Sequence, residues 1–373
     1  MDVFKRFEED DIVRANPTQV STGLWTGDTG SLVAFYTSST QTASLAGGYF
    51  WDIYDVDPAA SSLAEKQFAI AYGHIAGSGS ATLAEDDNAL LETKATYFQY
   101  RNILLTPDDT HFTFLPDAEG AAFDADEIFI VNIYRGRLRE KLDPGNWKLT
   151  LMHISASDGG DTFTTHSFID DSGQTLGESF GESGRVFNIV SGTLTGVSGS
   201  TVVASSSVSG GFGLVYPDLG ILVLNPRALA SVSASALTDL STVINRGNPQ
   251  VLLNAMVGPY TASDGVPAFA TTGSLAFGSG ESDFQARSAE SIASTHFFVR
   301  LRNQEFNYSN NPSFFNETNG AILNTNFVND PRVFVTTIGL FNDSNELLAT
   351  GKLSQPTQKS FDRELLIRVR LDF

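Results

Sequence analysis

Strands are predicted along most of the chain by runs of aromatic and β-branched residues and by period-two alternation. In 147–154, apolar residues alternate with Lys148, Thr150 and Met152, as in a strand with one buried face. The run YFWDIYDV at 49–56 is bracketed by Gly47-Gly48 and Pro58, which are residues that end strands. These patterns predict strands at 31–37, 49–56, 68–72, 128–134 and 147–154, and shorter ones at 185–190, 200–204 and 219–224.

The last seventy residues give the strongest strand pattern. We predict strands at 319–328, 333–341, 346–353 and 364–373, with a hairpin loop at Asn342–Asn345. In the last of these strands, apolar residues from Leu365 to Phe373 alternate with charged ones. We therefore expect the final strand, including Phe373, to complete a sheet.

Helical spacing of apolar residues appears in three segments. Residues 84–105 carry one apolar face and end before Pro107, and residues 228–245 form a weaker pattern. Residues 285–305 carry a stripe that is opposed by Arg287, Glu290 and Arg300, so a helix is predicted there as well. The fold class expected is α+β, predominantly antiparallel β in sandwich-like modules with a few helices.

Four regions follow from these elements. Residues 1–22 are predicted to be a polar amino-terminal arm, and 23–154 a β-rich module with one helix. The Gly/Ser/Thr-rich range 155–284 is predicted to be a β region with one helix. Residues 285–373 are predicted to combine a helix with an antiparallel carboxy-terminal sheet.

The excess of acidic residues limits the kinds of partner that the chain can bind. It contains 43 acidic and 23 basic residues and has a formal charge of −20. Phosphate backbones and anionic lipid repel such a chain, so we expect no nucleic-acid partner and no membrane insertion. Halophilic or merely soluble proteins can be equally acidic.

The opening residues contain no apolar signal core, and no apolar run reaches ~18 residues, so we expect synthesis in a cytoplasm.

Motifs for catalysis, metal binding or cofactor binding are not found. The chain has no cysteine, and its five histidines form no i, i+4 pair and no HExxH motif. No phosphate-binding loop or GxSxG elbow occurs. Adjacent acids occur at Asp55/Asp57, Asp108/Asp109, Asp124/Asp126/Glu127 and Asp170/Asp171. They could supply a glycosidase pair or a calcium site, but in so acidic a chain they are better explained as residues of solvated turns. We therefore expect no enzyme activity, metal or cofactor.

One basic run stands out in this acidic chain. Arg135, Arg137, Arg139 and Lys141 lie within RGRLREK, without aromatic residues that would stack on bases. Two interpretations remain open. The run either contacts an acidic neighbouring copy of the chain or is a solvated strand end.

Two sequence blocks carry a family likeness. The first contains FYTSSTQTASLAGGYFWDIYDVDP, QFAIAYGHIAGSGS and YFQYRNILL, and the second contains RNQEFNYSNNPSFF and TNFVNDPRVFVTTIGLFNDSNELLATGKLSQPTQKSFDRELLIRVRLDF. The first resembles the amino-terminal part, and the second a carboxy-terminal segment, of structural proteins from T-even-type marine and cyanobacterial phages. The middle range 155–285 resembles none of them.

This resemblance implies a non-enzymatic virion protein of the tail baseplate, whose partners are other tail subunits in multiple copies per particle. It brings no catalytic residues. It implies an ordered loop before the terminal sheet, which packs internally or against a neighbour and includes Arg302, Asn303, Phe306, Asn307, Tyr308 and Pro312. The alternatives are a neck or capsid-decoration protein, a receptor-binding or fibre-anchoring module, and a glycosidase-type tail enzyme.

Overall fold

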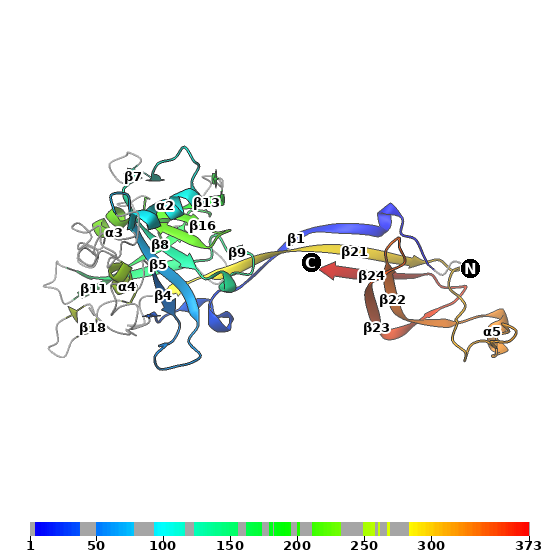
Figure 1. Cartoon of the computed structure of the whole chain (residues 1–373). Coiled ribbons are helices and arrows are strands. Elements are labelled where there is room, and N and C mark those ends of the chain that lie inside the picture. The colour runs from blue at the N-terminus through cyan, green and yellow to red at the C-terminus, as the bar shows by residue number, and fades with distance from the viewer. Residues whose placement is uncertain are drawn as a thin grey trace. The chain divides into compact units, whose positions relative to one another are not determined.

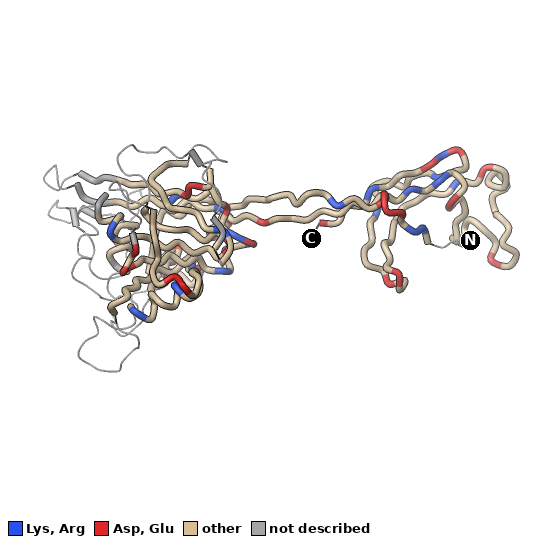
Figure 2. The backbone as a smooth tube through the Cα atoms, turned by 90° about the horizontal axis from the view of Figure 1, so that it is seen from above, with Lys and Arg blue, Asp and Glu red and all other residues tan. Residues whose placement is uncertain are grey.

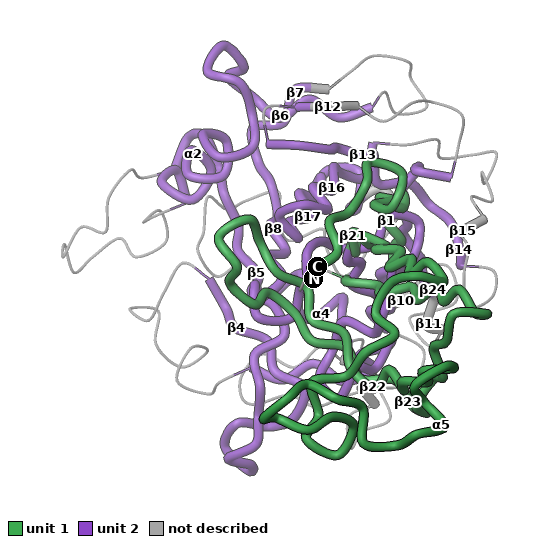
Figure 3. Tube along the Cα trace, turned by 90° about the vertical axis from the view of Figure 1, so that its right-hand side faces the viewer, with its two compact units in different colours: residues 1–19, 291–373 green, residues 20–290 purple. Residues whose placement is uncertain are grey.

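The chain divides into two units, which are described separately (Figure 3). Unit 1 comprises residues 1–19 and 291–373, and unit 2 comprises residues 20–290. The computed structural model describes residues 4–37, 50–77, 93–115, 123–155, 162–173, 179–181, 183–194, 200–201, 211–232, 249–257, 260–261, 267–268 and 283–372.

Unit 2 is built on an antiparallel sheet of twelve strands. The sheet joins strands from 23–154 with strands from 155–284. The strands lie in the order β2 (Ser31–Leu32), β20 (Phe284–Gln285), β10 (Lys148–Ser155), β11 (Thr162–Asp170), β13 (Gly184–Ser191), β16 (Gly213–Tyr216), β17 (Ile221–Leu224), β8 (Glu127–Ile133), β5 (Lys66–His74), β4 (Phe50–Tyr54) and β3 (Tyr36–Thr37), with β12 (Ser179–Gly181) beside β13.

Both faces of this sheet are buried in its central strands. In β17, Leu222 and Leu224 belong to one apolar cluster, and Ile221 and Val223 belong to the other. Because successive side chains point to opposite faces, the two clusters lie on opposite sides of the sheet. This double burial explains the uninterrupted apolar run ILVL.

Helices cover the two faces of the unit 2 sheet (Figure 1). Helix α2 (Thr93–Leu104) packs on β5, and its Tyr97 and Leu104 lie in one apolar cluster. Helices α3 (Pro226–Val232) and α4 (Pro249–Val257) contribute to the other cluster. Short two-stranded sheets complete the described part of unit 2: β6 (Phe112–Phe114) with β7 (Phe123–Ala125), β14 (Thr193–Leu194) with β15 (Ser200–Thr201), and β18 (Tyr260–Thr261) with β19 (Pro267–Ala268).

A second sheet has the order β1 (Ile12–Gly23), β21 (Arg287–Leu301), β24 (Leu365–Asp372), and β9 (Lys141–Leu142) also pairs with β21. Strands β1 and β21 each contribute residues to both units. Unit 1 also contains a hairpin of β22 (Val333–Phe341) and β23 (Leu347–Lys359), and the short helix α5 (Asn326–Asn329).

The expected fold class is confirmed, since the chain is mostly antiparallel β with a few helices. The hairpin loop at Asn342–Asn345 is confirmed, as are strands that overlap 333–341, 346–353 and 364–373. The helix predicted at 84–105 is α2, shorter than expected because residues 78–92 lie outside the described part. The helix predicted at 228–245 overlaps α3, and its remainder falls in residues 233–248, which lie outside the described part. Phe373, the last residue of the predicted final strand, also lies outside the described part.

The helix predicted at 285–305 is wrong. The segment forms strand β21, which pairs with β24 from Ser294↔Asp372 to Leu301↔Leu365. Its β-branched and aromatic residues, including Ile292, Phe298 and Val299, suit a strand once a pairing partner is available. The polar arm predicted for residues 1–22 likewise contains a strand, β1, that was not foreseen.

The strand predicted at 319–328 is also wrong, because turns and α5 occupy this segment. Asparagine side chains stabilise the turns locally. The Ala321 amide donates to Oδ1 of Asn319 at 3.0 Å, and the Asn326 amide donates to Oδ1 of Asn324 at 3.0 Å. Such side-chain bonds offer the backbone an alternative to a sheet ladder.

Candidate interaction surface

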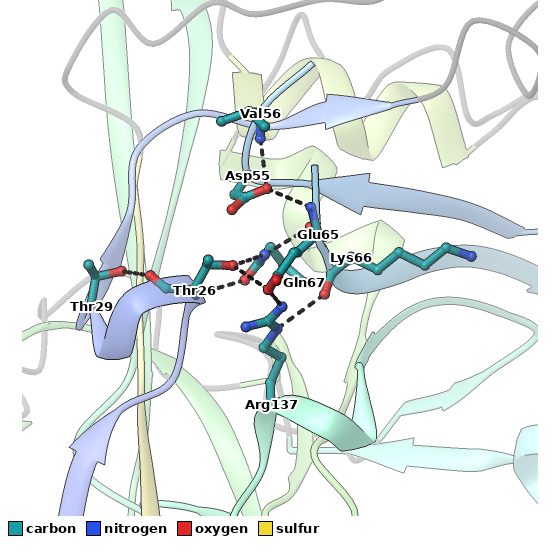
Figure 4. A network of polar contacts seen from close by, with 8 residues as sticks. All are labelled: Thr26, Thr29, Asp55, Val56, Glu65, Lys66, Gln67 and Arg137. Atoms are coloured by element: carbon teal, nitrogen blue, oxygen red, sulfur yellow. Dashed lines mark hydrogen bonds and ion pairs between the residues drawn. The ribbon is translucent and has the colours of Figure 1, made fainter. Parts of the chain in front are cut away.

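Within the basic run of unit 2, Arg137 is held by contacts inside its own unit (Figure 4). The guanidinium of Arg137 forms an ion pair with Glu65, and its Nε donates to the Lys66 carbonyl at 3.3 Å. Gln67 donates from Nε2 to Thr26 Oγ1 at 2.6 Å, and Thr26 Oγ1 lies 3.4 Å from Glu65. Arg137 thus joins the start of β5 to the short turn at 135–137.

The other basic residues of this run differ in their contacts. Arg135 donates to the Glu140 carbonyl at 3.1 Å, and Arg139 lies 3.5 Å from the Glu290 carboxylate. Lys141 is buried in β9. Arg135 and Arg139 are exposed. The contact of this run with an acidic neighbouring copy remains a prediction.

The adjacent acids of unit 2 support turns where they are described. Asp55 accepts bonds from the amides of Val56 and Glu65, and Asp109 accepts one from Thr106. Asp170 is buried, and burial raises the pKa of its carboxyl. It accepts hydrogen bonds from the amides of Gly145 and Ser172. Within the described ranges, no group of three or more histidines and acids is placed to hold a metal ion.

The 302–312 loop of unit 1 is organised by a lysine that the sequence did not single out. Lys359, at the end of β23, has a fully buried side chain with 0% exposure. Its Nζ donates to the Asn303 carbonyl at 3.0 Å, to Asn307 Oδ1 at 2.9 Å and to the Ser360 carbonyl at 3.0 Å. Asn307 Nδ2 returns a bond to the Asn303 carbonyl at 2.6 Å. The three acceptors therefore satisfy an ammonium whose pKa is lowered by desolvation.

Aromatic packing orders the rest of this loop. The Tyr308 ring lies 5.3 Å from the Phe314 ring in an edge-on arrangement, and its hydroxyl donates to the Gly320 carbonyl at 3.4 Å. Phe306 has a positive φ of 51° and a partly exposed ring. Pro312 is exposed. The predicted loop residues are thus brought together by local packing, and Phe306 and Pro312 are left accessible.

Arg302 lies at the start of the same loop. Its amide donates to Oε2 of Glu305 at 2.9 Å, and its guanidinium lies 3.7 Å from the Glu8 carboxylate. Lys5 forms a second ion pair, at 2.7 Å, with Glu305. These contacts attach the segment that precedes β1 to the loop.

The β22–β23 hairpin exposes large apolar side chains. Phe334 is 59% exposed and Leu348 is 67% exposed, and Phe341 and Leu347 are also exposed. A two-stranded hairpin is marginally stable by itself in water, and clustered exposed apolar residues mark interaction surfaces. No signal in the sequence distinguished these side chains from the buried ones of other strands.

A groove of about 800 Å³ lies within unit 1, beside this hairpin. Two of its basic side chains, Arg6 and Arg300, are exposed and have no hydrogen bond or ion pair among the described residues. The same holds for Asp343 at the hairpin tip. The walls of the groove come from residues 4–12, from the end of β21, from the hairpin and from single residues of the 302–312 loop and β24. The lining residues are Phe4, Lys5, Arg6, Phe7, Asp11, Ile12, Phe298, Val299, Arg300, Leu301, Phe306, Val335, Thr337, Ile338, Gly339, Leu340, Phe341, Asn342, Asp343, Asn345 and Ile367.

Charge is divided unequally between the units. Figure 2 marks the basic and acidic residues of the described part of the chain. Unit 1 has 11 basic and 13 acidic residues, a net charge of −2, and unit 2 has 12 basic and 30 acidic residues, a net charge of −18. Nearly all of the −20 charge of the chain therefore belongs to unit 2. Unit 1 is the part that can approach another acidic surface with little repulsion.

Comparison with known proteins gives no match. No protein-family model matches the chain, and no curated protein or solved structure matches it either. No helix in the described ranges is both long and apolar enough to cross a membrane.

Proposed function

We propose that the chain is a non-enzymatic structural subunit of a bacteriophage virion, located in the tail baseplate. It acts as a scaffold through large interfaces with other tail subunits and is present in several copies per particle. It is made in the host cytoplasm and becomes part of the virion there. The phage assignment rests on the sequence resemblance of its two terminal blocks.

The observation that carries the scaffold role is the exposed apolar surface of unit 1. Twelve of the nineteen large apolar side chains exposed among the described residues lie in unit 1, although unit 1 holds the smaller share of the residues that the structure describes. The cores of permanent interfaces are more apolar than ordinary protein surface. A hairpin that exposes Phe334, Leu347 and Leu348 suits burial against a neighbouring subunit.

The charge of the two units supports the same role. Burying a surface that carries a large charge of one sign costs desolvation and repulsion. Unit 1 avoids that cost because its basic and acidic residues are nearly balanced. Unit 2 keeps an acidic surface, which favours solubility until assembly.

The composition of purified particles tests this function. Virions banded repeatedly in a density gradient are analysed by quantitative mass spectrometry for peptides of this chain. We expect a constant ratio to the tail proteins through every round and in isolated tails. A constant ratio in heads alone would favour capsid decoration, and loss of the chain during banding would reject a structural role.

A further inference from the structure

The unit 1 groove combines apolar walls with unpaired charges of both signs. Phe4, Phe306 and Phe341 line it and are partly exposed, so an occupant would remove their rings from water. Arg300 lies on the β21 wall and Asp343 lies at the tip of the hairpin. Neither side chain has an ionic partner among the described residues.

A groove with apolar walls, an unpaired arginine and an unpaired aspartate is complementary to a second copy of itself. In an interface with twofold symmetry the same patch faces itself, so residue i of one subunit contacts residue j of the other and the reverse also holds. The groove offers two unpaired cations, Arg6 and Arg300, and an unpaired carboxylate, Asp343, so reciprocal ion pairs between Arg300 and Asp343 fulfil that requirement. A patch of a single sign would repel its copy.

The charge of the whole chain restricts where two copies can meet. Two unit 2 surfaces, each at −18, repel one another, whereas two unit 1 surfaces, each at −2, barely do. We propose that the unit 1 groove binds a second copy of this chain through the same surface, with Arg300 of each copy facing Asp343 of the other. This inference names one partner of the scaffold and so rests on the proposed function.

A charge-swap experiment on the full chain tests this inference. Sedimentation velocity over a wide concentration range, at physiological salt, measures self-association of the wild type, Arg300→Glu, Asp343→Lys and the double variant. We expect a dimer for the wild type and a dissociation constant raised by about tenfold or more for each single reversal. The double variant should restore association to near the wild-type level.

Arg368→Glu is the matched control, because Arg368 is exposed on β24 and does not line the groove. It makes the same charge change, and we expect it to leave association unchanged. Circular dichroism melting curves check that every variant is folded. A chain that stays monomeric, a dimer indifferent to the single reversals, or a double variant weaker than both singles would overturn the inference.

The outcome separates this inference from the proposed function. A monomeric chain that nevertheless purifies with tails would reject only the self-association. A groove-dependent dimer absent from particles would reject only the virion role.

Discussion

Nζ of Lys359 lies 2.9 Å from Oδ1 of Asn307, and this buried bond links the end of β23 to the loop that follows β21. The two residues are separated by 52 positions in the sequence. The bond, with the two carbonyls that complete the coordination of the ammonium, fixes the loop that carries Phe306 into the groove wall.

Replacing Lys359 with Met should destabilise unit 1. The substitution leaves Oδ1 of Asn307 without its lysine donor, at a cost of about 1–3 kcal/mol for a buried acceptor. Lys352→Met, at an exposed position of the same strand, should change stability by less than about 0.5 kcal/mol. Hydrogen exchange of the β22 and β23 amides measures both effects, and equal protection in the two variants would contradict the account.

The same lysine gives a pH dependence with a definite sign. Desolvation lowers the pKa of Lys359 below its ordinary value of 10.5, so the folded chain releases this proton before the unfolded chain does. Between the folded pKa and 10.5 the unfolded state binds more protons, and stability rises with pH. The stability of the wild type minus that of Lys359→Met, measured by denaturant titration, should therefore increase as pH rises toward 10.5. A decrease would show that the ammonium is stabilised by its surroundings.

The two arginines of the 135–137 turn should differ when truncated. Arg137→Ala loses the Glu65 ion pair and the bond to the Lys66 carbonyl, and should cost unit 2 about 1 kcal/mol. Arg135→Ala loses one exposed bond to a carbonyl and should cost less than about 0.5 kcal/mol. Chemical denaturation measures the difference, and the reverse order would argue against a structural role for Arg137.

Asp170 should resist replacement by its own amide. An asparagine places donor hydrogens where the carboxylate accepts bonds from Gly145 and Ser172, so Asp170→Asn should destabilise unit 2 by about 1–3 kcal/mol. Asp28→Asn removes the same charge at an exposed residue of positive φ that asparagine tolerates, and should be nearly neutral. Thermal melts of the two variants compare the losses. A neutral Asp170→Asn would mean that the buried carboxyl is dispensable.

Backbone strain should govern substitutions at Asn345. This residue has a φ of 62° in the hairpin loop, a conformation that glycine and asparagine adopt readily. Asn345→Gly should be nearly neutral, whereas Asn345→Val should lose about 1–3 kcal/mol because a β-branched residue is strained there. The melting temperatures of the two variants measure the contrast, and similar values would refute the strain argument.

The sequence predicted the parts of this fold that depend on local pattern. The final strand and the Asn342–Asn345 loop were predicted correctly because alternation and turn residues report directly on pleat and turn. Strand β21 was mistaken for a helix because its apolar residues also fit a helical stripe, and pairing with β24, about seventy residues later, decided the outcome. In physical terms, a tertiary partner overrode the local pattern.

The candidate surface was predicted only in part. The resemblance singles out the residues from Arg302 to Pro312, and hydrogen bonds and aromatic packing join several of them in one loop. Their role as an interface stays a prediction. Lys359, which organises that loop, lies in a polar stretch whose sequence gives no sign of burial. The groove depends on residues 4–12 meeting the hairpin, a long-range contact that single-sequence patterns do not report.

Cryo-electron microscopy of intact virions, with this chain traced in the map, would show whether the chain is a baseplate subunit. We expect density for the chain in the tail baseplate, with the unit 1 groove, Phe334 and Leu348 covered by neighbouring subunits. A map in which these unit 1 surfaces face solvent, or in which the chain is absent from the tail, would contradict this expectation.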